Sequence, residues 1–241
     1  MGLKKHIPDA ITSMNLLCGV FGVIVTLQGR VDTAFLLMLA AAAFDFFDGF
    51  AARLLHACSP VGKELDSLAD VVSFGVLPAL VLYRLMSFQV RGWIAFLPLV
   101  LAVFSALRLA KFNVDERQHA TFLGLPTPAS AMICGSLAYY VWHEPFTVLA
   151  QWCGTVWFLP AVAAVLSALL VCEVPMFSLK PAPEDPVAGF KRTAFFSIIA
   201  IIAVMVAVLR FDWSMIVLMT FTAYILMNLV FACFRSRLQE D

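Results

Sequence analysis

The chain has 241 residues, of which 62% are hydrophobic and 13% are charged, and its formal net charge at pH 7 is zero. Soluble globular domains are typically about half apolar and about a quarter charged. The composition therefore excludes a water-soluble globule. We expect a polytopic membrane protein that is surrounded by membrane lipid and has no nucleic-acid partner.

The first predicted element is a short interfacial segment, 1–8, which does not resemble a cleaved signal peptide. About 20 helical residues cross a bilayer core, so stretches with few charges locate the spans that follow. Eight are expected, at 10–29, 33–55, 65–81, 92–107, 126–142, 158–171, 193–209 and 213–234. The predicted fold class is all-α, a polytopic transmembrane bundle of about eight helices with both termini on one side.

Two polar stretches, 113–125 and 173–191, interrupt the predicted spans. The second contains four prolines, which prevent a continuous helix. Both are expected to be loops, and neither is long enough to suggest a second domain. We therefore expect a single integral membrane domain over 1–241.

The distribution of Lys and Arg predicts the orientation. If the N-terminus is inside, twelve of the sixteen basic residues face the cytoplasm: Lys4, Lys5, Arg53, Lys63, Arg108, Lys111, Arg117, Lys180, Lys191, Arg192, Arg235 and Arg237. This asymmetry predicts a protein of the cytoplasmic (inner) membrane with both termini inside. The end of the second span and the start of the third then lie at the cytoplasmic face, where a soluble substrate can reach them.

Four aspartates lie in these two otherwise apolar spans: Asp45, Asp48, Asp66 and Asp70. Carboxylates in membrane helices are costly to bury, and they usually mark functional sites. Residues three or four apart share a helix face, so each helix presents a carboxylate stripe. If the two helices form an antiparallel hairpin, the stripes face each other and the four carboxylates share one cavity.

So much negative charge in one cavity requires cations. Carboxylate oxygens are hard ligands, and the histidines and cysteines are dispersed, so Mg²⁺, Mn²⁺ or Ca²⁺ would fit and a zinc site is not indicated. Two divalent ions would balance four carboxylates and suit a pyrophosphate. Gly49 and Gly62 allow a ligand close to the backbone, and Arg53 can bind phosphate through a forked pair of hydrogen bonds.

The complete pattern is Asp45-x2-Asp48-Gly49-x2-Ala52-Arg53-x8-Gly62-x3-Asp66-x3-Asp70. It resembles the signature of the CDP-alcohol phosphotransferases, integral membrane enzymes that move a substituted phosphate from a CDP-linked donor to an alcohol. The chain is most similar to the phosphatidylserine synthase branch, at 7–16, 66–76, 108–113 and 124–128. The resemblance implies catalytic helices at about 7–145 and additional C-terminal helices at about 153–235.

The activity implied by the resemblance is transfer of the phosphatidyl group from CDP-diacylglycerol to the hydroxyl of L-serine, which gives phosphatidylserine and CMP. Asp45, Asp48, Asp66 and Asp70 would hold two divalent ions, Mg²⁺ or Mn²⁺, and Asp70 would also accept the serine proton. The family's donor-binding positions match Pro8, Asp9, Thr12, Gly49, Ala52, Arg53, Ser59 and Gly62. Asp9 stands where the family pattern has Asn. The family also implies a homodimer.

The carboxylate of L-serine requires a nearby cation. Candidates are Arg108 and Lys111 at the end of the fourth span, with Asn113 as a hydrogen-bonding neighbour. Basic residues at cytoplasmic helix ends are also ordinary topology anchors, and this reading stays open.

Two other functions are compatible with the aspartates. A divalent-cation transporter also keeps carboxylates in the membrane, but near its midplane and between broken helices. Another member of the same enzyme family would use glycerol phosphate or an inositol compound, which calls for several basic residues beside the cavity. A phospholipase D-like synthase is excluded, because no His has Lys two residues later.

Overall fold

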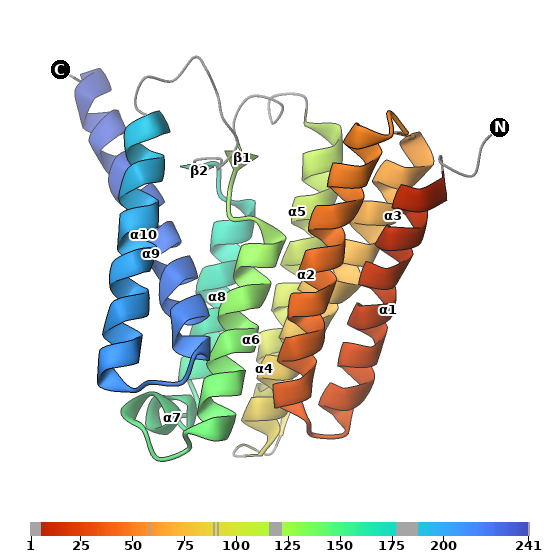
Figure 1. Cartoon of the computed structure of the whole chain (residues 1–241). Helices are drawn as coiled ribbons and strands as arrows, with labels where there is room; N and C mark the ends of the chain where they lie inside the picture. Colours follow the sequence, from red (N-terminus) through yellow and green to blue (C-terminus); the bar gives the residue numbers. More distant parts are fainter. Residues whose placement is uncertain are drawn as a thin grey trace.

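The computed structural model describes residues 6–57, 59–88, 90, 92–115, 122–176 and 188–240. The long helices lie side by side as a bundle, with the N-terminal helices at one edge and the C-terminal helices at the other (Figure 1). Parts of the two predicted polar loops, 116–121 and 177–187, lie outside the described residues.

The first half of the chain forms two helical hairpins. α1 (Ile7–Leu27) and α2 (Val31–Leu54) are joined by a three-residue turn in which Gly29 has φ +89°. The next helical segment is continuous from Pro60 to Ser87 and consists of α3 (Pro60–Asp70), the π-helical η2 (Val71–Val76) and α4 (Leu77–Ser87). It is followed by the 3₁₀ turn η3 (Trp93–Leu99) and α5 (Val100–Val114).

The third predicted span begins earlier than expected. The Ser59 Oγ accepts a hydrogen bond from the backbone N–H of Gly62 at 2.9 Å, and Pro60 occupies the first helical turn. Both features favour a helix start at this point. Gly62 therefore lies on α3, whereas the sequence placed it in the connection between the two spans.

The second half contains α6 (Thr127–His143), α7 (Val148–Cys153), α8 (Phe158–Val171), α9 (Ala188–Leu209) and α10 (Ser214–Glu240). α7 was not predicted. Two short strands, β1 (Phe122–Leu123) and β2 (Pro175–Met176), pair antiparallel between segments that the sequence predicted to be loops. Gly124 follows β1 with φ +76°, and a Cβ there would meet the carbonyl oxygens of Leu170 and Cys172 at 2.7 and 2.8 Å.

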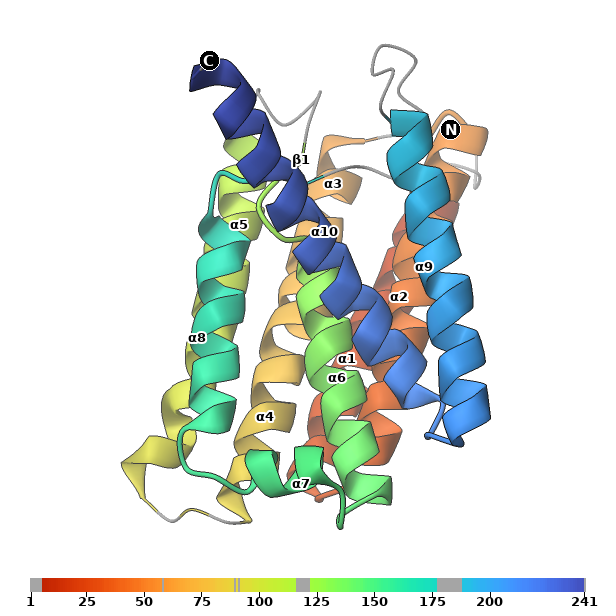
Figure 2. The ribbon, with the colours of Figure 1, turned by 90° about the vertical axis from the view of Figure 1, so that its left-hand side faces the viewer.

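Five helical segments are long and apolar enough to cross a membrane: Ile7–Leu27, Val31–Leu54, Pro60–Ser87, Trp93–Val114 and Ser214–Cys233. The other three predicted spans are also helical, but α6 has 17 residues and α8 has 14, and the apolar part of α9 is Thr193–Leu209. The count of eight spans therefore stays a prediction. The start of α1 and the end of α10 lie at the same end of the bundle, as expected (Figures 1 and 2).

Helix α1 packs closely against the continuous helical segment Pro60–Ser87. This packing fixes the position of α1 relative to the aspartates. The Cα of Gly19 faces Ser73 of η2, and that of Gly22 faces Leu77 of α4. Ser73 Oγ donates a hydrogen bond to the backbone oxygen of Asn15 at 3.1 Å. Small residues at such positions allow helix backbones to approach closely in a membrane.

We expect Gly19→Ala to destabilise the fold. A Cβ at this position would lie 2.5 Å from Ser73 Oγ and 3.0 Å from its Cα, so the helices would have to separate. Overpacking of this kind typically costs about 1–3 kcal/mol. Gly189→Ala is the matched control, since a Cβ on Gly189 meets nothing within 4 Å. Thermal unfolding in detergent should show a lower midpoint for Gly19→Ala only; equal midpoints would contradict the packing.

Candidate active site

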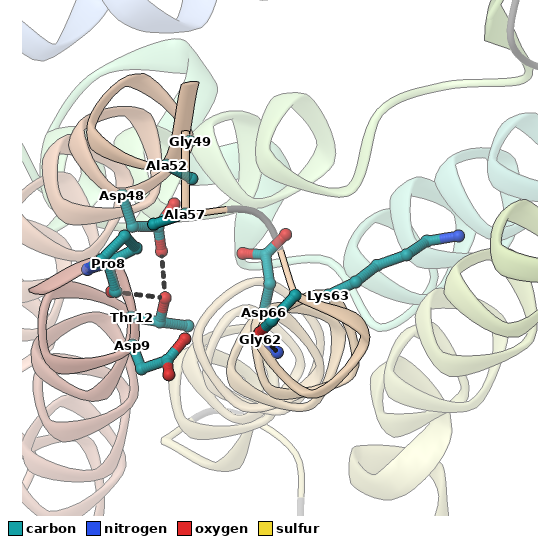
Figure 3. A pocket seen from close by; sticks show the side chains of 11 residues that line it. Pro8, Asp9, Thr12, Asp48, Gly49, Ala52, Ala57, Gly62, Lys63 and Asp66 are labelled. Carbon is teal, nitrogen blue, oxygen red and sulfur yellow. Dashed lines mark hydrogen bonds between the residues drawn. The ribbon is translucent and has the colours of Figure 1, made fainter. Parts of the chain in front are cut away.

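A cavity of about 210 Å³ opens at the end of the bundle where α2 ends and α3 begins. Its walls come from the first turns of α1, the last turns of α2, the α2–α3 connection and the start of α3 (Figure 3). The lining residues are Pro8, Asp9, Thr12, Asp48, Gly49, Ala52, Ala57, Ser59, Gly62, Lys63 and Asp66.

Three of the four aspartates meet beside this cavity. Each of Asp45, Asp48 and Asp66 offers a carboxylate oxygen, and these oxygens all lie within 4.8 Å of one another. Asp48 and Asp66 come from different helices and point into the space between them (Figure 3). The predicted convergence of the α2 and α3 carboxylates is therefore confirmed for these three.

Asp70 lies one helical turn beyond Asp66 and is buried. It is outside the close group of three, but it interacts electrostatically with Asp45, Asp66 and Asp48. The four carboxylates thus form one cluster, with Asp70 at its deeper side.

Helix α1 orients two of these carboxylates through residues three apart on one face. Thr12 Oγ donates a hydrogen bond to Asp48 Oδ2 at 2.7 Å, and it also lies 3.0 Å from the backbone oxygen of Pro8 (Figure 3). Asn15 Nδ2 donates to Asp70 Oδ1 at 3.2 Å. No role was predicted for Asn15. The feature of the sequence that could have identified it is a polar amide in the middle of an apolar span.

Among the described residues, no basic side chain forms an ion pair with these aspartates. The one ion pair found in that part of the chain is Lys111–Glu173, at 3.1 Å. In addition, Asp66 Oδ1 is buried and has no hydrogen-bond partner in the described structure. Buried carboxylates are usually paired or coordinate metals. The cluster therefore could bind a metal, and its all-oxygen donor set suits a hard divalent cation such as Mg²⁺ or Mn²⁺.

The cavity brings together seven of the eight residues predicted to bind the donor: Pro8, Asp9, Thr12, Gly49, Ala52, Ser59 and Gly62. A Cβ on Gly62 would lie 2.9 Å from Asp9 Oδ1 and 3.0 Å from Ser59 Oγ, so glycine keeps this wall open. The exception is Arg53, which is exposed and does not line the cavity. Its Nη1 lies 4.0 Å from where a Cβ on Gly49 would be.

Two cavity residues were not predicted, Ala57 and Lys63. Both lie between Arg53 and Asp66 in the signature, at positions where the pattern specifies no residue type, so the sequence carries no signal for them. The Lys63 side chain extends away from the other lining residues (Figure 3).

The three candidates for the acceptor pocket lie on α5 in different environments. Arg108 is only 7% exposed and interacts electrostatically with Asp70. Asn113 Nδ2 donates a hydrogen bond to Ser67 Oγ of α3 at 2.8 Å. Lys111 is 42% exposed on its side chain and pairs with Glu173, so only Arg108 of the two cations is buried near the aspartates.

Comparison with known proteins gives the family. A family model described as CDP-alcohol phosphatidyltransferase matches residues 5–160. A protein named CDP-diacylglycerol–serine O-phosphatidyltransferase in Mycobacterium leprae (strain TN) is 33% identical over 228 residues, which cover 91% of this chain and 73% of the relative. One of the same name in Bacillus subtilis (strain 168) is 34% identical over 150 residues, 62% of this chain and 84% of the relative.

An archaetidylserine synthase of Methanothermobacter thermautotrophicus is 35% identical over 135 residues, or 54% of this chain and 56% of the relative. The family match, together with the apolar helices, indicates an integral membrane protein.

We expect Asp66→Asn to abolish most of the binding of divalent cations. A ligand that binds only the folded protein raises its unfolding temperature, so Mn²⁺ should stabilise the purified wild-type protein. Loss of one carboxylate from the group of three should reduce that shift strongly. Asp32→Asn is the control, because Asp32 lies in the first turn of α2, far along the helix from Asp48. Equal Mn²⁺ shifts in wild type and Asp66→Asn would contradict a metal site here.

Proposed function

The chain belongs to the CDP-alcohol phosphatidyltransferase family, and we propose that it transfers the phosphatidyl group from CDP-diacylglycerol to L-serine, giving phosphatidylserine and CMP. The observation that carries the proposal is the clustering of three signature aspartates, within 4.8 Å, beside a cavity lined by the other signature residues. The names of the relatives support serine as the acceptor.

In this proposal the head group of CDP-diacylglycerol occupies the cavity, with its diphosphate toward the aspartates and its acyl chains between helices. Asp45, Asp48, Asp66 and Asp70 would hold two divalent ions, Mg²⁺ or Mn²⁺. When bound, these ions would neutralise the diphosphate and stabilise the charge that develops on the departing CMP. Thr12 contributes by fixing the Asp48 carboxylate through its 2.7 Å hydrogen bond.

Asp70 acts as the general base. A serine hydroxyl is a poor nucleophile at neutral pH, so removal of its proton during attack lowers the barrier. Asn15 donates to Asp70 Oδ1, which holds the carboxylate in place and leaves its second oxygen for the proton. The serine oxygen then forms a bond to the phosphorus that carries diacylglycerol, the bond from that phosphorus to CMP breaks, and CMP takes the electron pair.

The acceptor binds on the α5 side of the cluster. The buried guanidinium of Arg108 interacts with Asp70, so it can receive the serine carboxylate beside the base. Asn113, bonded to Ser67 of α3, borders the same side, and Lys111 extends the positive charge toward the surface.

The protein would lie in the cytoplasmic membrane with both termini and the active site facing the cytoplasm, where serine and CMP are soluble. It would form a single membrane domain with catalytic helices at about 7–145 and additional helices at about 153–235, and it would assemble as a homodimer.

Two alternatives are less well supported. Glycerol phosphate or an inositol phosphate would require several cations at the acceptor side, and Arg108 is the buried cation that the described structure places near Asp70. A cation transporter would place its carboxylates midway through the bundle. Here the cavity and the three clustered aspartates lie at one end of the bundle.

The test is CMP release by the purified full-length protein in detergent with CDP-diacylglycerol and Mn²⁺. We expect release that requires both L-serine and the metal, and a loss of at least about 10³-fold in Asp70→Asn, because a general base typically contributes 10²–10⁴-fold and Asp70 is also a proposed ligand.

Glycerol 3-phosphate, inositol phosphate and a reaction without acceptor are run in parallel. Release with one of these acceptors in place of serine would assign the protein to a different reaction of its family. No release with any acceptor would contradict the enzymatic proposal.

A further inference from the structure

Arg84 lies at the end of the bundle opposite the active site. It belongs to the last turn of α4, close to the turn that joins α1 and α2 (Figure 1). The cavity and the clustered aspartates lie at the other end. Arg84 therefore has no place in the proposed reaction, and its role requires a separate explanation.

Two contacts hold the Arg84 guanidinium in place. Its central carbon lies 4.4 Å from the centre of the Phe88 ring, an arrangement in which the ring attracts the cation. Its Nη2 lies 3.1 Å from where a Cβ on Gly29 would be. Gly29 has φ +89°, so a larger residue there would be strained and would also crowd the guanidinium. The guanidinium is thus fixed between the α1–α2 turn and the end of α4.

Neither contact uses the hydrogen-bond donors of the guanidinium. Arg84 Nε is buried and has no hydrogen-bond partner in the described structure, and no carboxylate of the described residues forms an ion pair with Arg84. A charged donor that is left without an acceptor raises the free energy of the fold. The residue as a whole is partly exposed. An oxygen anion from outside the chain would therefore supply the missing acceptors.

The aromatic side chains around Arg84 indicate which anion is available. Phe88 is 54% exposed and Trp142 is 45% exposed, and their ring centres lie 6.3 Å apart. Exposed tryptophan at the ends of membrane helices is typical of the membrane–water interface. The phosphates of phospholipids lie in this layer, and a guanidinium matches a phosphate group through paired hydrogen bonds.

We propose that Arg84 binds the phosphate of a phospholipid in the membrane leaflet opposite the active site. The guanidinium would donate its free N–H groups to the phosphate oxygens, and an acyl chain would lie on the exposed rings of Phe88 and Trp142. The bound lipid would join the α1–α2 turn to the end of α4. This site is independent of the proposed reaction.

The competing explanation is that Arg84 only anchors the end of α4 at the interface through its charge. Such an anchor would need no defined lipid, and any basic residue at this end of the bundle would act in the same way. Arg210 provides the comparison, because it is exposed and lies at the same end, in the connection between α9 and α10 (Figure 1).

The test compares Arg84→Gln with Arg210→Gln in the full-length protein, purified in a maltoside detergent, which carries no phosphate. A chelator removes divalent ions, so the aspartate cluster repels phosphates and the active site does not compete. Phosphatidylglycerol is titrated, and native mass spectrometry gives its Kd. The matching diacylglycerol serves as a ligand without phosphate, and inorganic phosphate at equal concentration serves as a competitor.

We expect Arg84→Gln to raise the Kd of phosphatidylglycerol about ten- to a hundredfold, as is typical when hydrogen bonds to a charged group are lost. Arg210→Gln should stay within about twofold of wild type, because exposed charges contribute little. Diacylglycerol should bind wild type and Arg84→Gln equally weakly. Inorganic phosphate should not displace the lipid, since it lacks the acyl chains.

Equal Kd values for wild type and Arg84→Gln would overturn the proposal. The same loss in Arg210→Gln would also overturn it, because it would indicate a general anchor. Diacylglycerol that binds as tightly as phosphatidylglycerol would show that the phosphate is not recognised. Displacement by inorganic phosphate would exclude a lipid as the occupant.

If Arg84→Gln does not fold, Phe88→Leu replaces it. Loss of the ring frees the guanidinium and should weaken the binding of phosphatidylglycerol several-fold. Phe96→Leu is the matched control, because Phe96 is 55% exposed and stacks on Tyr83, with ring centres 5.2 Å apart. Equal weakening in the two variants, or none in Phe88→Leu, would contradict the site.

Discussion

Four aspartates of two adjacent membrane helices share one end of the bundle, and no basic side chain of the described residues lies within ion-pair distance of them. Burying a carboxylate that has no ion-pair partner costs several kcal/mol per ion, even after relaxation. The groups around the aspartates stabilise this concentration of negative charge. Hydrogen bonds from Thr12 and Asn15 reduce part of the cost, and the remaining oxygens, including the buried Asp66 Oδ1, are left for cations.

The packing of α1 makes these hydrogen bonds possible. Gly19 and Gly22 let α1 lie directly against η2 and α4, which brings the face with Thr12 and Asn15 onto Asp48 and Asp70. At the other wall, the Ser59 cap starts α3 early enough to place Gly62 beside Asp9. The same contacts therefore support both the stability of the fold and the proposed chemistry. A substitution that separates α1 from the segment Pro60–Ser87 would affect both.

Much of the site could be predicted from the sequence because it is local. The spacings of three and four residues place Asp45 with Asp48 and Asp66 with Asp70 on single helix faces, and a short connection forces the two helices to be neighbours. Seven of the eight residues that the signature predicts to bind the donor line the cavity, and their binding role stays a prediction. Arg53 does not line the cavity, although its Nη1 lies 4.0 Å from where a Cβ on Gly49 would be, so its role in binding the donor stays a prediction.

Other features depend on contacts between distant segments, for which helical periodicity gives no signal. Lys111 and Arg108 are equivalent as basic residues near a helix end, but tertiary packing pairs Lys111 with Glu173 and buries Arg108 beside Asp70. The β1–β2 pairing arises in the same way. The sequence could therefore locate the cluster of aspartates, but it could not tell which basic residue is buried near it.

The most direct measurement is an anomalous difference map from crystals grown with Mn²⁺. The account predicts strong peaks among the carboxylates of Asp45, Asp48, Asp66 and Asp70, lost in crystals of Asp66→Asn. Manganese bound elsewhere, with no peak between these aspartates, would contradict the claim that the buried carboxylates form a divalent metal site.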